Sequence, residues 1–195
     1  MHASGIIDYI HCSTDSPTIG ALAEEYGAHC HWLRSAENAS DTADIEDVVT
    51  EEVTRFHKLG EHPGIVVLCY ATSVFVTPED IRWAVERVRA GARAVMGIAA
   101  FGRPVQRALI RKPEGGVRFA FAEYEHSSTN TLPRYYYDPG QVYAFRPRAF
   151  LDAWAAGVSL IGMMEDTREL TLVWDIDEPR DWEIAEGLWR QRHGA

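Results

Sequence analysis

The stretch that decides the fold is "GIVVLCYATSVFVTPEDIRWAVERVRAGARAVMGIAA", residues 64–100. Residues 64–70 are almost continuously apolar, which is typical of a parallel strand that is covered on both faces. Thr77 and Pro78 then predict the start of a helix over 78–90, because threonine is a favoured N-cap and proline fits the first helical position. One face of this helix carries the apolar residues Ile81, Ala84, Val85 and Val88. A further strand is expected at 93–99, so the stretch reads as a strand–helix–strand unit of an α/β fold.

The rest of the chain continues this alternation. Further strands are expected at 6–13, 29–33, 105–111, 117–122, 140–145, 158–163 and 170–174. Further helices are expected at 17–26, 43–58, 147–156 and 179–191, with an irregular, aromatic-rich segment at 123–138. With 195 residues and no internal repeat or low-complexity linker, the pattern predicts a single domain spanning 1–195. We expect a three-layer α/β sandwich with a mostly parallel sheet.

Composition narrows the class of protein. The hydrophobic fraction of 46% is ordinary for a globular domain, and the net charge of −10 argues against nucleic acid as the main partner. The N-terminus lacks a basic segment followed by a long apolar one, and no run of about 18 apolar residues occurs. These features predict a cytoplasmic protein without a membrane span. Cys12, Cys30 and Cys69 have no CxxC spacing, so we expect reduced thiols.

Four polar segments follow predicted strands. In an open α/β sheet, ligands bind beyond the carboxyl ends of the strands. The segments at those ends are 13–15, 34–44, 70–76 and 175–179. We therefore expect them to converge on one crevice.

Asp175 and Asp177 are separated by one residue, and this spacing has two interpretations. If a strand continues through them, both carboxylates point the same way and can share Mg²⁺, which prefers oxygen ligands and keeps substrate phosphates in its coordination sphere. Alternatively, Asp177 caps the helix entered through Pro179, and Asp175 is a polar residue at a strand end. The spacing alone leaves both open.

Other candidate residues also have two interpretations. Arg34 could hold a phosphate or a base edge, and the nearby Ser40-Asp41-Thr42 could equally be an ordinary helix N-cap. Gln106 and Arg107 are expected on opposite faces of a strand, where one could face a ligand. The sequence contains neither a GxSxG nucleophile motif nor a GxxxxGK[ST] or GxGxxG phosphate loop. Metal-assisted transfer is therefore a better expectation than covalent catalysis.

Taken in order, several segments resemble the family of CMP-sialic acid synthetases, the acylneuraminate cytidylyltransferases, and most closely its CMP-pseudaminic acid synthetase branch. The segments are "SGIIDYIHCSTD" (4–15), "LAEEYGAHCHWLRSAENASDTA" (22–43), "FGRPVQRALI" (101–110), "DPGQVYAF" (138–145) and "WDIDEPRDW" (174–182). They are similar to that family's STD turn, its RPAE and SDTA segments, its PIQRAL and DAGQFY strands and its DIDTPEDW close. The resemblance runs through almost the whole chain.

The resemblance implies a mononucleotide-binding fold and a reaction in which a nonulosonic acid attacks the α-phosphate of CTP and releases pyrophosphate. It places Asp15, Arg34 and Asp41 at the nucleotide, Gln106 and Gln141 at the sugar, and Asp175 and Asp177 as ligands of Mg²⁺. It also implies a homodimer whose subunits meet through about residues 105–150, a segment that would also contribute to sugar binding.

The sequence departs from the family pattern in three ways. The resemblance begins at the family's second strand, so the first strand and its ARGGSKR-like phosphate loop have no counterpart in these residues. Ser128 occupies a position where the branch carries arginine, and Pro139 replaces the small residue before the glycine of DAGQ. These departures keep two alternatives open: a non-catalytic relic of the family, and a nucleotide-sugar glycosyltransferase with a DxD-like metal site.

Overall fold

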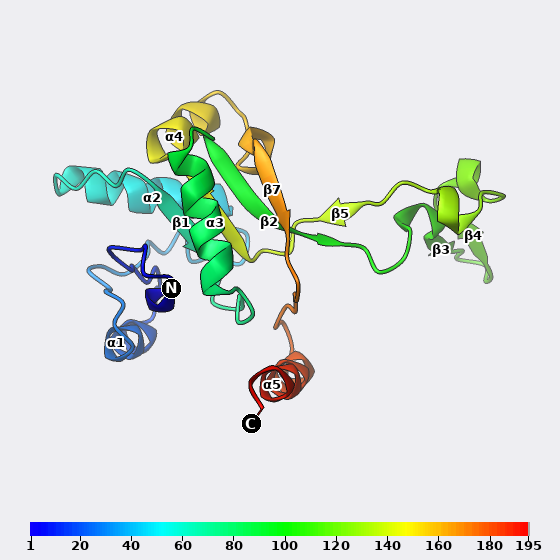
Figure 1. Cartoon of the computed structure of the whole chain (residues 1–195), viewed down its shortest axis with the longest axis horizontal. Helices are drawn as coiled ribbons and strands as arrows, with labels where there is room; N and C mark the ends of the chain where they lie inside the picture. The colour runs from blue at the N-terminus through cyan, green and yellow to red at the C-terminus, as the bar shows by residue number, and fades with distance from the viewer. Residues whose placement is uncertain (195) are drawn as a thin grey trace.

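The computed structural model describes residues 1–194, which form a layered α/β body with a long projecting arm (Figure 1). The helices are α1 (Pro17–Glu25), α2 (Ile45–Lys58), α3 (Pro78–Arg89), α4 (Pro147–Ala155) and α5 (Pro179–His193). The strands are β1 (Val66–Cys69), β2 (Ala94–Ala100), β3 (Leu109–Arg111), β4 (Val117–Phe119), β5 (Tyr136–Tyr137), β6 (Val142–Phe145) and β7 (Asp166–Glu169). The α/β class predicted from the sequence is confirmed.

The main sheet has five strands, in the order β1-β6-β2-β5, with β7 also paired to β2. The prediction of a mostly parallel sheet is wrong, because β6 pairs antiparallel with both β1 and β2, and only β7 runs parallel to its partner β2. The cause is the long excursion between β2 and β6, which returns the chain to the sheet without a crossover helix. Strands β1, β2 and β7 nevertheless run in one direction.

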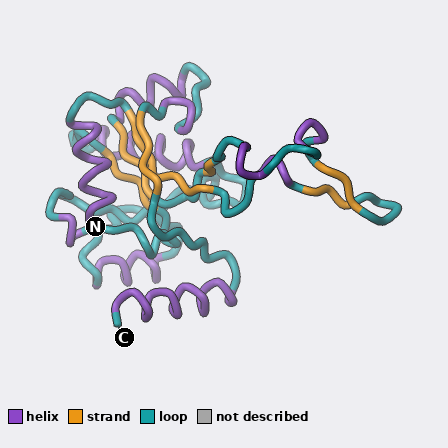
Figure 2. Tube along the Cα trace, turned by 45° about the vertical axis from the view of Figure 1, so that its right-hand side comes forward, coloured by secondary structure: helices purple, strands orange, loops and turns teal. Residues whose placement is uncertain are grey.

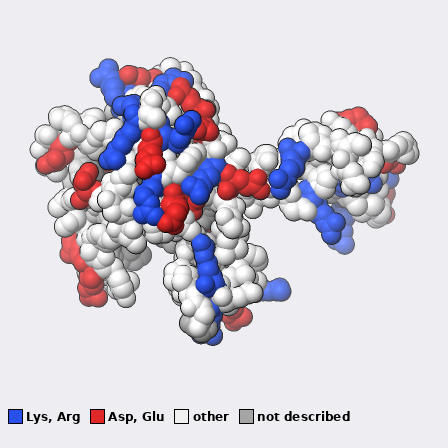
Figure 3. All heavy atoms as spheres, viewed as in Figure 1, with Lys and Arg blue, Asp and Glu red and all other residues white. Residues whose placement is uncertain are grey.

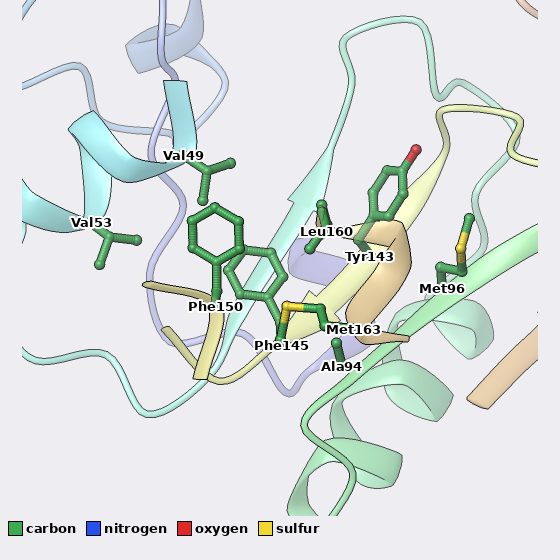
Figure 4. Close-up of a cluster of buried hydrophobic side chains, with 9 residues drawn as sticks. All are labelled: Val49, Val53, Ala94, Met96, Tyr143, Phe145, Phe150, Leu160 and Met163. Carbon is green, nitrogen blue, oxygen red and sulfur yellow. The ribbon is translucent and has the colours of Figure 1, made fainter. Parts of the chain in front are cut away.

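Helices cover both faces of this sheet, as expected for three layers. Alternate residues of β2 and β6 point to opposite sides, so that Val95 and Ala144 pack against Ala84 and Val88 of α3. The opposite face packs against α2 and α4 around Phe145. Figure 4 shows this larger cluster, which consists of Val49, Val53, Ala94, Met96, Tyr143, Phe145, Phe150, Leu160 and Met163.

Caps fix where the best-predicted helices begin. Thr77 and Asp80 form a reciprocal capping box at α3: the Thr77 hydroxyl accepts from the Asp80 amide at 3.2 Å, and the Asp80 carboxylate accepts from the Thr77 amide at 3.0 Å. The predicted start of α3 is therefore confirmed. At α2 the N-cap is Asp44, so the expectation that residues 40–42 cap this helix is wrong.

The expected N-terminal strands 6–13 and 29–33 are almost absent. They are reduced to one parallel bridge between His11 and His29, supported by bonds from the Cys12 amide to the His29 carbonyl at 2.8 Å and from the His29 amide to the Ile10 carbonyl at 2.9 Å. Within residues 1–194 neither segment pairs with a strand of the main sheet. Each segment therefore has only the other to bond with, and most of its backbone groups join no ladder, which accounts for the loss of regular structure.

The C-terminal part also differs from expectation. Residues 158–163 form a turn and a 3₁₀ helix over Ile161–Met163, and residues 170–174 are irregular. Leu160 and Met163 are both buried three residues apart, which is the spacing of a 3₁₀ turn and not of a strand. The Leu160 amide donates to the buried carboxyl group of Glu46 at 3.0 Å. Burial raises the pKa of Glu46, and a hydrogen bond with the Asp44 side chain raises it further.

The arm comprises residues 101–137 and leaves the body from the end of β2. It carries the β3–β4 hairpin and returns through β5, and it projects away from the body in both ribbon views (Figures 1 and 2). Residues 105–107, predicted as part of a strand, form a 3₁₀ turn directly before β3. On the face shown in Figure 3, the body carries interspersed charges of both signs, while much of the arm is uncharged.

Within residues 1–194, no helix is long and apolar enough to cross a membrane. The three cysteines are free thiols, and burial raises the pKa of the Cys69 thiol to about 12. All three cysteines are half-buried, and that they are reduced stays a prediction.

Candidate functional site

The candidate site lies at the edge of the sheet where β1, β2 and β7 end and β6 begins. Gln141 directly precedes β6 at this edge, and its side chain is only 1% exposed. Its amide nitrogen donates to the Pro139 carbonyl at 3.2 Å, while its side-chain oxygen has no hydrogen-bond partner within residues 1–194. A buried acceptor without a partner costs free energy, so this oxygen is suited to accept a hydrogen bond from a ligand.

Three hydrogen bonds fix the turn that precedes and contains Gln141. The Asp138 carboxylate accepts from the Gly140 amide at 3.0 Å and from the Tyr143 hydroxyl at 2.6 Å. Ser73 donates to the Gln141 carbonyl at 2.8 Å. Gly140 has φ +64°, and a Cβ there would lie 3.2 Å from the ring of Tyr70, so a side chain is disfavoured by both conformation and space.

Gln106 has the same combination of features on the arm, in the turn directly before β3. It is 2% exposed, its amide nitrogen donates to the Pro133 carbonyl at 3.1 Å, and its side-chain oxygen has no partner within residues 1–194. Its neighbour Arg107 donates to the Tyr124 and Glu125 carbonyls at 3.1 and 2.7 Å. The two glutamines that sequence reasoning singled out are thus both buried with a free acceptor, and both are held by carbonyls of the segment 133–139.

Arg34 is held against the turn that contains Asp15. Its guanidinium donates to the Ser13 carbonyl at 2.6 Å and to the Ser13 hydroxyl at 3.1 Å, and its amide donates to the Thr14 carbonyl at 2.8 Å. Asp15 itself is exposed. The structure therefore brings together two of the three residues predicted at the nucleotide, with part of the Arg34 guanidinium already engaged by the protein.

Asp41, the third of them, lies on the exposed turn before α2, and its side chain forms no hydrogen bond within the described part of the chain. Ser40 and Thr42 on either side of it line a hollow of about 520 Å³. The charged side chains that line this hollow are all carboxylates, namely Glu37, Asp44, Asp47 and Glu51. This hollow disfavours a phosphate unless a cation accompanies it.

Glu52 of α2 is a largely covered carboxylate, 12% exposed, behind the Ser13–Asp15 turn, and it was not predicted from the sequence. It accepts hydrogen bonds from the Ser13 hydroxyl at 2.5 Å, the Trp32 indole at 2.6 Å and the His11 ring at 3.1 Å. A signal was present in the sequence, because Glu52 lies three and four residues after Val49 and Val48, on the apolar face of the helix. A carboxylate at such a position needs buried donors, and here it orders the turn that Arg34 contacts.

The hydrogen bonds to Glu52 predict a pH-dependent effect of the Glu52→Gln substitution. Burial opposes ionisation, but the three donors outweigh it and lower the pKa of Glu52 below its usual value. A lowered folded-state pKa stabilises the protein above the unfolded pKa, and that stabilisation is lost as the pH falls through the folded pKa. We expect Glu52→Gln to reduce the free energy of unfolding by about 1–3 kcal/mol at neutral pH, and by less below the usual glutamate pKa of about 4.3.

Urea unfolding at several pH values measures this effect. Glu86→Gln, which changes an exposed carboxylate of α3, is the matched control and should have little effect at any pH. An equal loss for Glu52→Gln at neutral and acidic pH would contradict the role given to the ionised carboxylate.

Asp175 and Asp177 lie on the irregular segment between β7 and α5, so they do not share a strand face as the magnesium hypothesis assumed. The alternative, that Asp177 caps α5, is wrong: the N-cap is Glu178, and the Asp181 carboxylate accepts from the Glu178 and Asp177 amides at 2.9 and 3.2 Å. In the described part of the chain the Asp175 carboxylate accepts from the Ile176 amide alone, at 3.0 Å. Both carboxylates are exposed, and neither forms an ion pair within residues 1–194.

In the described chain no group of three or more His, Cys, Asp and Glu side chains is arranged to hold a metal ion. Asp175 and Asp177 by themselves offer two carboxylates without competing cations. That donor set fits a Mg²⁺ ion whose other ligands are water and substrate phosphate, and not an ion held by protein alone.

Comparisons with known proteins relate this geometry to a family. The family model described as "Cytidylyltransferase" matches residues 1–112, which is more than half of the chain. The chain belongs to the cytidylyltransferase family. The resemblance inferred from the sequence motifs is thereby confirmed at the level of the family.

Curated members of the family include proteins that are similar over most of this chain. The pseudaminic acid cytidylyltransferase of Campylobacter jejuni serotype O:2 is 25% identical over 97% of this chain and 82% of its own length. The CMP-N,N'-diacetyllegionaminic acid synthase of Legionella pneumophila is 35% identical over 49% of this chain, and the match spans 41% of its own length.

Solved structures support the fold. A CMP:2-keto-3-deoxy-manno-octonic acid synthetase complexed with CTP superimposes with a TM-score of 0.63 at 14% identity, covering 98% of this chain and 86% of that one. A 4-diphosphocytidyl-2C-methyl-D-erythritol synthase from Anaerococcus prevotii gives a TM-score of 0.62 at 12% identity, covering 97% and 84%. At such identities the likeness concerns the α/β fold alone.

Proposed function

We propose that this cytidylyltransferase transfers CMP from CTP to the anomeric hydroxyl of a nonulosonic acid of the pseudaminic or sialic acid type and releases pyrophosphate. The observation that carries the proposal is the pair of buried glutamines, Gln106 on the arm and Gln141 at the sheet edge, each with an acceptor oxygen that has no partner within residues 1–194. A polyhydroxylated sugar acid supplies the donors that such acceptors need. The similarity to the pseudaminic acid cytidylyltransferases over 97% of the chain supports the choice of sugar.

In this proposal the remaining candidate residues are divided between nucleotide and metal. Asp15, Arg34 and Asp41 face the nucleotide, and Asp175 and Asp177 hold Mg²⁺. When bound, Mg²⁺ would neutralise negative charge on the nucleotide phosphates. The part of the Arg34 guanidinium that is not engaged by Ser13 is available to a nucleotide phosphate or base edge. The Ser13–Glu52 hydrogen bond fixes the turn from which Arg34 acts.

The proposal also includes a homodimer formed through the arm. Its support is the set of exposed apolar side chains that the arm carries outside any core. They are Phe101, Leu109, Ile110, Val117, Phe121, Tyr135, Tyr136 and Tyr137.

A pyrophosphate-release assay tests the proposal. The purified protein is incubated with CTP, Mg²⁺ and either pseudaminic acid or N-acetylneuraminic acid, and the CMP-sugar is identified by mass spectrometry. Release that requires CTP, Mg²⁺ and one of the sugar acids is expected; no release with either acid would refute the function, and turnover of UDP- or GDP-sugars instead would favour a glycosyltransferase. Sedimentation of the same sample gives the mass, and a monomer at assay concentration would remove the homodimer from the proposal.

A further inference from the structure

Asp138 lies where the arm returns to the body, between β5 and the turn that contains Gln141. One oxygen of its carboxylate, Oδ1, accepts two hydrogen bonds, from the Tyr143 hydroxyl at 2.6 Å and from the Gly140 amide at 3.0 Å. Tyr143 belongs to the buried cluster, whereas Gly140 directly precedes Gln141. A single oxygen therefore connects the hydrophobic core to the turn of the candidate site.

Tyr143 is a firmly placed donor for this oxygen. It is 3% exposed and lies in β6, where it pairs with Leu68 of β1 on one side and with Met96 of β2 on the other. Figure 4 shows its hydroxyl pointing away from the other labelled side chains of the cluster. Burial, together with the hydrogen bond to Asp138, raises the pKa of Tyr143, so the hydroxyl keeps its proton and remains a donor.

Other polar groups of the turn also have partners. The Ser73 hydroxyl donates to the Gln141 carbonyl at 2.8 Å and lies 3.2 Å from the Gly140 carbonyl oxygen, and the Pro139 carbonyl accepts from the Gln141 side chain at 3.2 Å. The side-chain oxygen of Gln141 is the exception, since it has no partner within residues 1–194. Glycine has more conformational freedom than any other residue, so the bond from the Gly140 amide to Asp138 limits where this oxygen points.

The second oxygen of the Asp138 carboxylate forms neither a hydrogen bond nor an ion pair with the described residues. The side chain is exposed, so water solvates its charge. The surrounding residues therefore use the position of one acceptor oxygen and not the negative charge. An asparagine side chain can supply the same acceptor.

We propose that Asp138 is a positioning residue, which holds the turn so that the free oxygen of Gln141 accepts a hydrogen bond from a hydroxyl of the sugar acid. The proposal rests on the proposed function, because that function assigns Gln141 to the sugar substrate. Asp138 acts through Gln141, so it affects the binding of the sugar acid and not that of CTP.

Substitutions of Asp138 test this role in steady-state kinetics. Asp138→Ala removes the acceptor and should raise the KM for the nonulosonic acid about three- to tenfold, the range of one net hydrogen bond, with less than about a twofold change in the KM for CTP. Asp138→Asn keeps the acceptor without the charge and should have a KM close to that of wild type. Asp8→Ala, which changes an exposed aspartate outside the site, is the control. If Asp138→Asn is as impaired as Asp138→Ala, the charge matters and the positioning role is wrong.

A second variant guards against a loss of folding. Asp138→Ala leaves the buried Tyr143 hydroxyl without the acceptor that it has in the wild-type protein, whereas the double variant Asp138→Ala/Tyr143→Phe removes that hydroxyl as well. The double variant should show the same raised KM for the sugar acid as Asp138→Ala. A return to the wild-type KM would assign the effect to the unpaired hydroxyl and overturn the inference. Circular dichroism verifies that each variant folds.

Hydrogen–deuterium exchange separates this inference from the proposed function, because it needs no substrate. NMR follows the exchange of the Gly140 amide in the wild-type protein, Asp138→Ala and Asp138→Asn. Asp138→Ala should speed this exchange about threefold or more, since a hydrogen-bonded amide exchanges only when its bond opens, and Asp138→Asn should leave it unchanged. That result supports the role of Asp138 even if no pyrophosphate is released, whereas an unchanged rate in Asp138→Ala would overturn the inference even for an active enzyme.

Discussion

Asp175→Asn and Asp177→Asn are each expected to lower the rate of pyrophosphate release by about 100-fold or more. An asparagine side chain has the same shape as aspartate but no charge, so it is a poor ligand for Mg²⁺, and loss of one preorganised electrostatic contact typically costs a factor of about 10²–10³ in rate. The structure indicates that a loss of rate in these variants can be distinguished from a loss of stability. Neither carboxylate caps α5 or forms an ion pair within residues 1–194, so the substitutions should leave stability unchanged.

The measurement is the rate of pyrophosphate release as a function of Mg²⁺ concentration. The variants should need more Mg²⁺ for half-maximal rate, which a purely structural defect would not produce. Glu183→Gln, an exposed carboxylate on the first turns of α5, is the control and should behave like wild type. If both aspartate variants keep most of the wild-type rate, the metal assignment is wrong.

Phe150→Ala is expected to give the largest loss of stability, about 3–5 kcal/mol in the free energy of unfolding. Phe150 of α4 is 1% exposed, and its ring centre lies 5.2 Å from that of Phe145 in β6. Figure 4 shows these two rings together in the cluster beneath α2 and α4. Truncation removes the buried ring and leaves a cavity that a sheet held by helices on both faces cannot close.

Urea unfolding followed by circular dichroism measures this loss. Tyr26→Ala is the control, because Tyr26 is 79% exposed and its truncation should change the free energy of unfolding by less than about 0.5 kcal/mol. Phe150→Leu should give an intermediate value, since it restores part of the volume. A loss below about 1 kcal/mol for Phe150→Ala would show that this cluster contributes less to stability than its burial implies.

The helices that cover the sheet could be predicted because their signals are local. The Thr77 cap and the apolar stripe of α3 lie within one short segment, and the stripe that includes Val49 and Val53 identified α2 in the same way. Such patterns need no knowledge of the partner they pack against. The antiparallel direction of β6, in contrast, depends on how the distant arm returns to the sheet.

Strand β7 shows why other elements could not be predicted. Its sequence is Asp-Thr-Arg-Glu, which has no apolar alternation. Ion pairs to α3 cover one side of it: Asp166 accepts from Arg87 at 2.6 Å, and Arg168 lies 3.2 Å from Asp80. These ion pairs and the ladder with β2 hold the strand, and none of them leaves an apolar pattern in the sequence. The apolar run 170–174 was therefore mistaken for the strand that lies at 166–169.

The candidate site was predictable to a similar degree. Gln106 and Gln141 were identified through motif resemblance, and the structure places both in buried positions that their sequence neighbours did not reveal. Glu52 was missed because its three donors, His11, Ser13 and Trp32, come from segments that lie far from it in the sequence.

The fold of the arm also determines where the chain tolerates an insertion. The root is fixed by the ladder between β2 and β5. The tip of the hairpin is exposed, and within residues 1–194 its backbone bonds only to itself, through the Gly115 and Lys112 amides at 3.0 and 3.1 Å. Insertions succeed best at exposed tips whose backbone makes no distant contacts. We therefore expect a peptide tag or a fluorophore between Lys112 and Gly116 to leave the fold of the body unchanged, and its effect to be confined to contacts that the arm makes with a second subunit.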